Sequence, residues 1–370
     1  MITVILFFTR GVSLQIWDKV GMLAREVALY RRLLDSRVQI YFVTYGDKSE
    51  LNYTSRLTGI RILCNRWNLP GGLYEHLIPW LHAPWLRRAD IIKTNQTNGA
   101  DLALSSARLW HKPLIARSGF ILSDHLKKES GSSTKNIRRA LETEAAVFNA
   151  AQRIVVTTLE MADSIKRRIP SVKERIHVIP NYVDTDSFIP KINIEPEFDL
   201  VFVGRLNLQK NLFSLVDAIE SLNLRLLIIG DGELHDELVR RKSQMNGQIE
   251  WHTKIPNEHL CDQLHRARVF ILPSHYEGHP KALLEAMASG MPVIGANSPG
   301  IREVIQHGVN GWVCETDPNS IRAAIQKLIA NAELQNILGI QARKYIVDNL
   351  SLDRILKLEL ALYSEILDER

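Results

Sequence analysis

This 370-residue sequence contains four charged side chains whose types and spacing suit a phosphorylated, hydroxyl-rich ligand. They are Glu277, Glu285, Arg205 and Lys210. Carboxylates accept hydrogen bonds from hydroxyl groups, so the two glutamates suit a sugar or a ribose. Arginine offers a planar fork of donors and lysine offers a point charge, and together they suit a diphosphate. A nucleotide-sugar carries both kinds of group.

The two glutamates follow a predicted strand. Residues 269–273 form an apolar run of strand length, Glu277 comes in the turn after it, and Glu285 lies inside the predicted helix 282–289. A helix start at the carboxyl end of a strand is where open α/β sheets bind phosphorylated ligands. The alternative is an amphipathic helix whose acidic residues merely face water, and for a lone glutamate that would be favoured.

The two basic residues follow another predicted strand, 199–203. Gly204 frees the backbone there, and Arg205 and Lys210 come in the loop that it opens. A solvated basic loop is the usual fate of a lone arginine or lysine. Because the loop and the two glutamates are expected at the same rim of strand ends, we favour a functional site.

Predicted strands and helices alternate along the whole chain, in two successive series. The first series of strands is 2–8, 38–45, 60–63, 91–94, 113–117, 153–158 and 176–179, and the second is 199–203, 224–229, 249–252, 269–273 and 291–295. Predicted helices lie between them, among them 17–34, 99–110 and 136–151. This alternation predicts an α/β protein of two doubly wound Rossmann-like domains that face each other across a cleft.

The domain boundaries are predicted from composition. We expect a first domain over 1–188, a linker over 189–197, a second domain over 198–345 and a C-terminal helical segment over 346–370. The linker has two prolines, charge and little regular pattern. The last predicted helix, 352–367, is amphipathic and would cross back to brace the first domain.

Bulk properties indicate an ordinary globular protein, with 45% hydrophobic and 24% charged residues. The three cysteines (Cys64, Cys261 and Cys314) lack metal-ligand spacing and fit a reducing cytoplasm. No apolar run reaches the roughly 18 residues of a spanning helix, and the opening residues 1–8 are predicted to be a buried strand rather than a signal peptide. A net charge of +5 and a pI near 9.0 permit peripheral contact with the anionic inner face of a cell membrane. We expect no nucleic-acid partner.

Aromatic and basic residues gather in one Pro/Gly-interrupted region, 67–88. It contains Trp67, Tyr74, Trp80 and Trp85 together with His76, His82, Arg87 and Arg88. Two interpretations remain open: a membrane-surface or acceptor-binding face, or aromatic residues buried on irregular helices, which we favour.

Four motifs occur in order between residues 180 and 285. They are Pro180-Asn-x-Val-Asp-Thr-Asp-x-Phe, Gly204-Arg-Leu-(x)3-Lys-Asn, Ile229-Gly-Asp-Gly and Glu277-(x)7-Glu285. Together they resemble the family 4 retaining glycosyltransferases of GT-B fold, over roughly residues 150–345. The resemblance implies transfer of a hexosyl-type sugar from a nucleotide-sugar donor to an acceptor hydroxyl with the anomeric configuration retained, in surface polysaccharide or glycolipid biosynthesis. It implies a saccharide or lipid-linked acceptor.

Carried over to this sequence, the resemblance gives each residue a role. Arg205 and Lys210 would clamp the diphosphate and stabilise charge on the leaving nucleotide, and with Glu277 they are the expected catalytic residues. Glu277, Gly278 and His279 would hold the transferred sugar, and Glu285 the ribose. Thr253 and Ile255 would contact the base, although the family usually has glycine where Thr253 stands. We interpret Gly230, Asp231 and Gly232 as a structural turn.

The acceptor side is predicted from the first half of the chain. The family often has a histidine after the strand equivalent to 114–117, where this chain has Ser118, Gly119 and Phe120. We take Arg117, Ser118 and Gly11 as the local candidates. For Gly11, close approach of a substrate and an ordinary tight connection are equally good interpretations.

The expected reaction needs neither a metal nor another cofactor. We favour front-face transfer, in which a donor phosphate oxygen takes the acceptor's proton, so a missing histidine is tolerable. We interpret Asp184 and Asp186 as a structural turn rather than metal ligands. The alternatives are a nucleotide-sugar 2-epimerase or other GT-B enzyme such as a sugar phosphorylase, and a non-catalytic saccharide-binding module.

Overall fold

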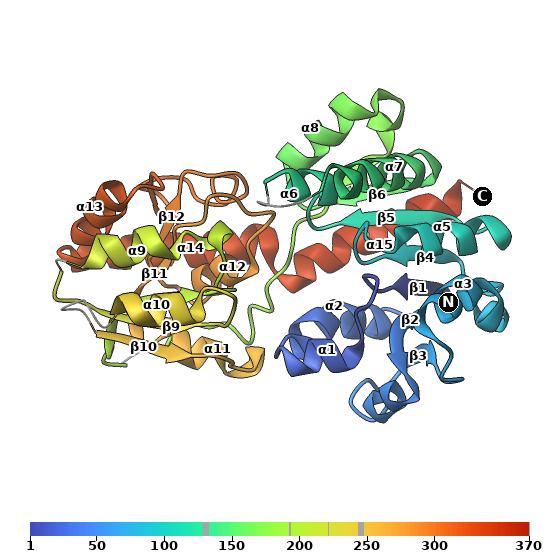
Figure 1. Ribbon diagram of the computed structural model, residues 1–370, viewed down its shortest axis with the longest axis horizontal. Coiled ribbons are helices and arrows are strands. Elements are labelled where there is room, and N and C mark those ends of the chain that lie inside the picture. Colours follow the sequence, from blue (N-terminus) through green and yellow to red (C-terminus); the bar gives the residue numbers. More distant parts are fainter. Residues whose placement is uncertain (129–132, 192–193, 221, 243–247, 370) are drawn as a thin grey trace. The chain divides into compact units, whose positions relative to one another are not determined.

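The computed structural model describes residues 1–128, 133–191, 194–220, 222–242 and 248–369. The chain folds into two compact units (Figure 1). The first unit contains residues 1–180 together with 355–370, and the second contains residues 181–354. The predicted linker 189–197 therefore begins after the change of unit, and its residues 192 and 193 lie outside the described residues.

The first unit is built on a seven-stranded parallel sheet of order β3-β2-β1-β4-β5-β6-β7. Figure 1 shows β5, β4, β1, β2 and β3 side by side in that order. The strands are β1 (Ile2–Phe7), β2 (Val38–Asp47), β3 (Ile60–Asn65), β4 (Ile91–Thr94), β5 (Leu114–Ser118), β6 (Arg153–Val156) and β7 (Ile176–Val178).

Helices connect successive strands of this sheet. They are α1 (Leu14–Lys19), α2 (Leu23–Asp35), the 3-10 helix η1 (Lys48–Tyr53), α3 (Gly71–Leu81), α4 (Ala83–Leu86), α5 (Ala100–Leu109), α6 (Leu122–Lys128), α7 (Thr134–Ala150), α8 (Leu159–Arg168) and the 3-10 helix η2 (Pro170–Arg175). The predicted helix 17–34 is in fact two helices, because the chain turns at Gly21 with a φ of 75°. Sequence reasoning did not predict η1; for residues 67–88 it favoured irregular helices without giving bounds, and α3 and α4 lie there.

The second unit has a six-stranded parallel sheet of order β10-β9-β8-β11-β12-β13. Its strands are β8 (Phe198–Val203), β9 (Arg225–Ile229), β10 (Gln248–His252), β11 (Ala267–Leu272), β12 (Val293–Ala296) and β13 (Trp312–Cys314). Its helices are η3 (Leu208–Lys210), α9 (Leu212–Ile219), α10 (His235–Lys242), α11 (Asn257–Leu264), α12 (Lys281–Ala288), α13 (Pro318–Ile329) and α14 (Ala332–Leu350), and the first residues of α15 (Leu352–Asp368). The strand β13 was not predicted.

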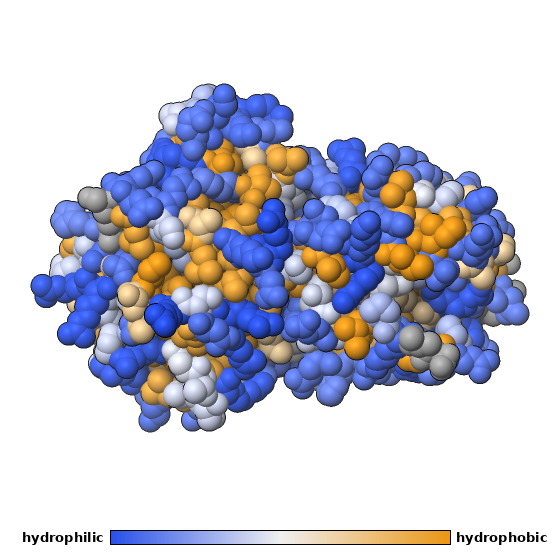
Figure 2. All heavy atoms as spheres, turned by 180° about the vertical axis from the view of Figure 1, so that it is seen from behind, coloured by the Kyte–Doolittle hydropathy of each residue, from blue (hydrophilic) through white to orange (hydrophobic). Residues whose placement is uncertain are grey.

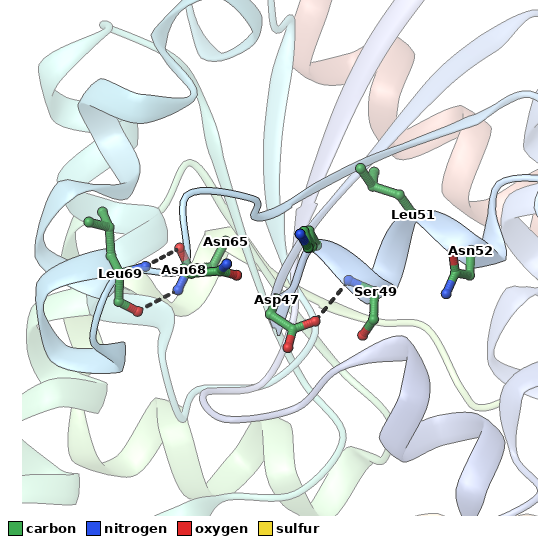
Figure 3. Close-up of a pocket in the computed structure, with 8 residues that line it drawn as sticks. Asp47, Ser49, Leu51, Asn52, Asn65, Asn68 and Leu69 are labelled. Atoms are coloured by element: carbon green, nitrogen blue, oxygen red, sulfur yellow. Dashed lines mark hydrogen bonds between the residues drawn. The ribbon is translucent and has the colours of Figure 1, made fainter.

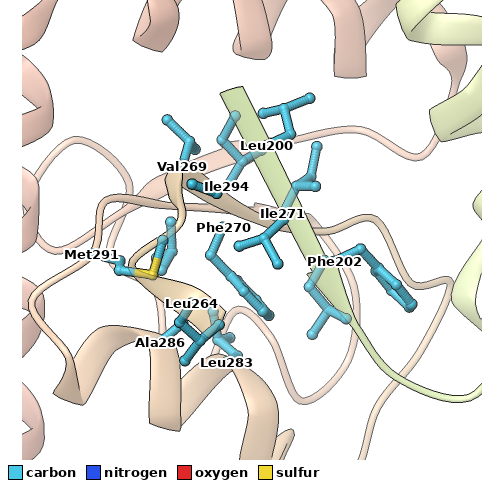
Figure 4. Packing of buried hydrophobic residues seen from close by; sticks show 14 of the residues in the cluster. Leu200, Phe202, Leu264, Val269, Phe270, Ile271, Leu283, Ala286, Met291 and Ile294 are labelled. Atoms are coloured by element: carbon cyan, nitrogen blue, oxygen red, sulfur yellow. The ribbon is translucent and has the colours of Figure 1, made fainter. Parts of the chain in front are cut away.

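Both sheets are covered on their two faces, which is why their strands are continuous apolar runs rather than alternating ones. In the second unit Leu200 of β8, Phe270 of β11 and Ile294 of β12 are fully buried, and Leu283 of α12 packs into the same core (Figure 4). The helix α12, which carries Glu285, is therefore held firmly on the sheet.

Each sheet has a switch point, where strand order reverses beside its first strand. It lies between β1 and β4 in the first unit and between β8 and β11 in the second. Open α/β sheets bind their ligands at the carboxyl ends of the strands at this point. The predicted fold class of two doubly wound Rossmann-like domains is confirmed.

The C-terminal helix α15 belongs to the first unit from Ile355 onward. The ammonium of Lys93 in β4 lies 2.5 Å from Glu359 of this helix, and both side chains are buried. Arg153 of β6 contacts Glu365 at 2.7 Å and also pairs with Glu369. The predicted return of the last helix to the first domain is confirmed.

Candidate functional site

We refer to the loop after β8, residues 204–211, as the basic loop. Hydrogen bonds to the turn after β9, residues 230–232, and to Ile229 hold its backbone in place. The backbone N–H of Gly204 donates to the carbonyl of Ile229 at 3.0 Å, and that of Leu206 donates to Asp231 at 3.0 Å. A Cβ at Gly230 would lie 1.8 Å from the carbonyl oxygen of Gly204, so no other residue fits there. The Gly-Asp-Gly turn thus supports the backbone of the basic loop, which agrees with its interpretation as a structural turn.

The basic loop brings one of its two cations into an ion pair. Lys210 Nζ donates to Glu277 Oε1 at 2.5 Å, and both side chains are largely buried, 15% and 8% exposed. Arg205 is exposed, and its guanidinium has no hydrogen-bond or ion-pair partner among the described residues. Lysine and glutamate from the ends of β8 and β11 therefore meet at the switch point of this sheet.

Two residues beside Lys210 fasten the basic loop to the loop after β11. The carbonyl of Gln209 accepts from the His275 N–H at 2.9 Å, and the Gln209 side chain donates to the Tyr276 carbonyl at 2.8 Å. Asn211 adopts a left-handed backbone (φ 55°) and donates through Nδ2 to the carbonyls of Pro273 and Thr316 at 3.1 and 2.7 Å. These bonds fix the separation of Lys210 and Glu277.

The loop after β12 closes on Glu277 from the other side. The Glu277 N–H donates to the Pro299 carbonyl at 2.9 Å. Gly300 has a φ of +78°, and a Cβ on it would lie 2.1 Å from the Gly278 carbonyl oxygen. The approach is backbone against backbone, which only glycine permits.

His279, in the loop after β11, joins that loop to the Pro-Asn motif (residues 180–188). Its Nδ1 accepts from the Asn181 N–H at 3.2 Å, and Asn181 Nδ2 donates to the His279 carbonyl at 2.8 Å. An accepting Nδ1 means that the ring is neutral with its proton on Nε2. Asp184 accepts from Ser187 Oγ at 2.8 Å and from the Asp186 N–H at 3.2 Å, so this pair of aspartates forms a local turn.

Glu285 lies on α12 and is only 2% exposed. Its Oε1 accepts from Asn257 Nδ2 at 2.8 Å, at the first residue of α11. Thr253 and Ile255 precede that helix in the segment after β10; Thr253 is exposed and Ile255 packs partly against the core. Asn257 thus connects the residue predicted to contact the ribose, Glu285, with the segment predicted to contact the base, because it binds Glu285 and follows Ile255 closely in the sequence.

Sequence reasoning gave no role to Gln209, Asn211 or Asn257, because an amide gains its partners only after distant loops meet. It also missed Ser274 and Ser298, which follow β11 and β12. Both hydroxyls are buried without a hydrogen-bond partner among the described residues. A buried hydroxyl of this kind is a group that a polar ligand satisfies.

The acceptor candidates lie in the first unit, at the ends of β1 and β5. Gly11 is exposed. Arg117 Nη1 donates to the Asn95 carbonyl at 3.2 Å. Ser118 is fully buried, and its hydroxyl donates to the Phe120 carbonyl at 2.5 Å. Ser118 thus shapes the turn after β5, whereas Gly11 and Arg117 border the switch point of the first sheet.

In the described part of the chain, no group of three or more His, Cys, Asp or Glu side chains is arranged to hold a metal ion. None of the described helices is both long and apolar enough to cross a membrane.

Two family models match adjoining parts of this chain. "Glycosyltransferase Family 4" matches residues 26–187, and "Glycosyl transferases group 1" matches residues 184–345. A curated relative in Escherichia coli, UDP-Gal:alpha-D-GlcNAc-diphosphoundecaprenol alpha-1,3-galactosyltransferase, is 28% identical over 71% of this chain and 72% of its own length. D-inositol 3-phosphate glycosyltransferase of Xylanimonas cellulosilytica is 30% identical over 51% of each chain.

Solved structures share the fold along the whole chain. Sucrose-phosphate synthase of Thermosynechococcus elongatus has a TM-score of 0.79 at 17% identity, with both chains fully covered. HepE of Anabaena, in complex with UDP and glucose, has a TM-score of 0.76 at 16% identity and covers 99% of this chain and 100% of its own. With its two doubly wound units and with matches that together span residues 26–345, the chain belongs to the family 4 glycosyltransferases of GT-B fold.

Proposed function

We propose that the protein transfers a hexosyl-type sugar from a nucleoside-diphosphate donor to an acceptor hydroxyl and retains the anomeric configuration. One observation carries the proposal: the Lys210–Glu277 pair lies at the switch point of the second sheet, beside the exposed Arg205. A lysine ammonium has three donors, and Glu277 occupies one of them. The other donors and the Arg205 guanidinium suit the two phosphates of a donor.

In the proposed reaction, the bond from the anomeric carbon to the leaving phosphate oxygen breaks. The acceptor oxygen bonds to the same carbon on the same face, and its proton goes to a phosphate oxygen of the leaving nucleotide. Lys210 and Arg205 stabilise the charge that develops on that nucleotide. Glu277 orients the hydroxyls of the transferred sugar.

The nucleoside half of the donor is assigned to neighbouring residues. Glu285, held by Asn257, would accept from the ribose hydroxyls, and Thr253 and Ile255 would border the base. Support comes from this hydrogen bond, because Asn257 is the first residue of α11, directly after the segment that follows β10, and it contacts Glu285 of α12. We propose that the reaction needs no divalent cation, since Lys210 and Arg205 supply the positive charge.

The acceptor is proposed to be lipid-linked, and the protein to work peripherally at the inner face of the cell membrane. The name of the Escherichia coli relative includes a diphosphoundecaprenol acceptor. On the face that Figure 2 shows, apolar side chains gather in patches bordered by hydrophilic ones. In α3 and the segment before it, Trp80 is 59%, Leu73 47% and Trp67 37% exposed, and the exposed Arg87 follows. Tyr74, by contrast, is buried.

Such a surface of tryptophan, leucine and arginine suits an anionic bilayer. We expect the protein to float with vesicles containing phosphatidylglycerol and the double variant Leu73→Ser/Trp80→Ser to float less. Equal flotation of the wild type and the double variant would show that α3 does not contact the membrane.

The donor assignment is tested by titrating nucleoside diphosphates and nucleotide-sugars into the wild type, Lys210→Ala and a control, Lys327→Ala. Lys327 is exposed on α13 and has no partner among the described residues. Loss of a charge-assisted hydrogen bond should weaken binding roughly ten- to hundredfold in Lys210→Ala alone. Equal affinity of the wild type and Lys210→Ala for every nucleotide would refute the donor site. The same titration with EDTA should give unchanged affinity.

A further inference from the structure

A pocket of about 790 Å³, lined mainly by residues of polar type, opens in the first unit at the carboxyl ends of β2 and β3. Its walls come from two segments, the 3-10 helix η1 and the loop after β3. Figure 3 shows Asp47 between the side chains of these two segments. The volume lies within the range of small-molecule sites, although such sites are usually lined by apolar groups. Here two leucines share the lining with six polar residues, three of them asparagines.

The pocket is held in shape by bonds that use some of these polar groups. Asn65 accepts from the Leu69 N–H at 3.1 Å and donates to the Leu69 carbonyl at 2.7 Å, so its amide clamps the loop. Asp47 Oδ1 accepts from the Ser49 N–H at 2.8 Å and caps η1. Between the clamped residues, Asn68 adopts a left-handed backbone with a φ of 53°. Asparagine is one of the few residues other than glycine that adopt this conformation readily.

Other polar groups of the pocket have no partner among the described residues. These are the exposed side-chain amides of Asn52 and Asn68 and the ammonium of Lys48. A side-chain amide can both donate and accept hydrogen bonds, and so can a hydroxyl group, so the two kinds of group pair well. Asp47 adds a carboxylate oxygen, and hydrogen bonds from the side chain and the N–H of Ser49 lower its pKa. The charges of the Asp47 carboxylate and the Lys48 ammonium offset each other in this lining, so a neutral, hydroxyl-rich ligand fits best.

A second pocket of about 260 Å³ lies next to the first along η1, since Ser49 and Asn52 line both. Its further lining includes Gln15 of α1, the helix that follows the Gly11 loop, and the pair Arg56–Asp18. The two nitrogens of the Arg56 fork donate to the Asp18 carboxylate at 2.9 and 3.0 Å. We call these two neighbouring pockets together the η1 groove; their lining reaches from the end of β3 to α1.

We propose that the η1 groove binds a saccharide part of the acceptor, at least two sugar units long. The inference rests on the proposed function, which requires a hydroxyl-bearing acceptor. The groove lies beside the switch point of the first sheet rather than on it, since β2 and β3 are the next strands outward from β1. It therefore holds sugar units other than the one that carries the reacting hydroxyl, and it makes the enzyme prefer acceptors that already bear a short glycan.

The experiment uses the full-length protein and saturation-transfer NMR with lactose, maltose, cellobiose and N,N′-diacetylchitobiose as probes. The variants are Asn52→Ala and Asn68→Gly; glycine tolerates the left-handed backbone, so Asn68→Gly removes the amide without adding strain. The matched control is Arg37→Gly, another exposed left-handed residue, which is outside the groove. Nucleoside-diphosphate binding is measured on the same samples.

We expect at least one disaccharide to bind the wild type and the control equally. The loss of one or two neutral hydrogen bonds should weaken its binding roughly three- to tenfold in each asparagine variant. Nucleotide binding should stay unchanged. Absence of binding by all four disaccharides, or binding insensitive to both asparagine variants, would overturn the proposal. Asparagine-dependent disaccharide binding without any nucleotide binding would instead leave the groove standing and refute the proposed function.

Discussion

Lys210 and Glu277 neutralise each other at the place where a donor's diphosphate and sugar are proposed to bind. The lysine would serve the phosphates and the glutamate the sugar, and each holds the other in position. Their types and their place after two strands were predictable from sequence, because parallel strands end at a common edge. Their direct contact was not predictable, since it depends on how Gln209 and Asn211 fasten two loops that are distant in the sequence.

Replacing Glu277 by glutamine should separate binding from transfer. The change removes a negative charge beside Lys210, so we expect nucleoside-diphosphate affinity to be kept or raised. Turnover of the nucleotide-sugar should fall roughly hundredfold, because a misplaced sugar loses its reactive geometry. The measurement is donor affinity and donor turnover in Glu277→Gln, with Glu333→Gln on the exposed face of α14 as control. Near-normal turnover would remove Glu277 from the sugar site.

At the scale of elements, the site is three loops after β8, β11 and β12 that touch through their backbones. Sequence reasoning found these strands because they are buried on both faces and continuously apolar. It gave no bounds for α3, where Gly71, Gly72 and the internal Pro79 are residues that normally discourage a helix. Burial of Tyr74 and Ile78 against the core outweighs this weak intrinsic preference.

Gly300→Ala tests the contact between two of the loops. The added Cβ would lie 2.1 Å from the Gly278 carbonyl oxygen, so the loop after β12 must move and loosen the bond from Glu277 to Pro299. Gly308→Ala is the matched control, because Gly308 has a similar φ of +73° but nothing within 4 Å of a Cβ. We expect both variants to lose some stability in thermal unfolding and only Gly300→Ala to lose donor turnover. Equal activity of the two variants would mean that the contact does not position Glu277.

At the scale of the molecule, the first unit is made of two distant pieces of sequence. The buried Lys93–Glu359 pair joins them, and Tyr363 lies 3.3 Å from the same ammonium. The amphipathic pattern of the last helix predicted that it would return. A lysine inside an apolar strand gave no hint of its partner, because the two residues are 266 positions apart in the sequence.

Glu359→Ala should therefore destabilise the first unit. An uncompensated buried charge costs about 3 to 5 kcal/mol of the free energy of unfolding. Burial already lowers the pKa of Lys93, and without Glu359 it should fall further, so the loss of stability should shrink as pH rises toward 10. Urea unfolding at pH 7 and 9 measures both effects. The double variant Lys93→Met/Glu359→Leu should have a free energy of unfolding close to that of the wild type. If it is as unstable as Glu359→Ala, lost packing of the helix, and not the unpaired charge, causes the destabilisation.

The first unit consists of two separate stretches of the chain, and this sets the order in which the two units can finish folding during synthesis. A ribosome makes residues 181–354 in full before it makes residues 355–370. Domains generally fold as units while the chain is being made. The second unit is continuous and can fold at once, whereas in the first Lys93 must wait for Glu359 to emerge. The unit that is begun first on the ribosome is thus the last to be completed.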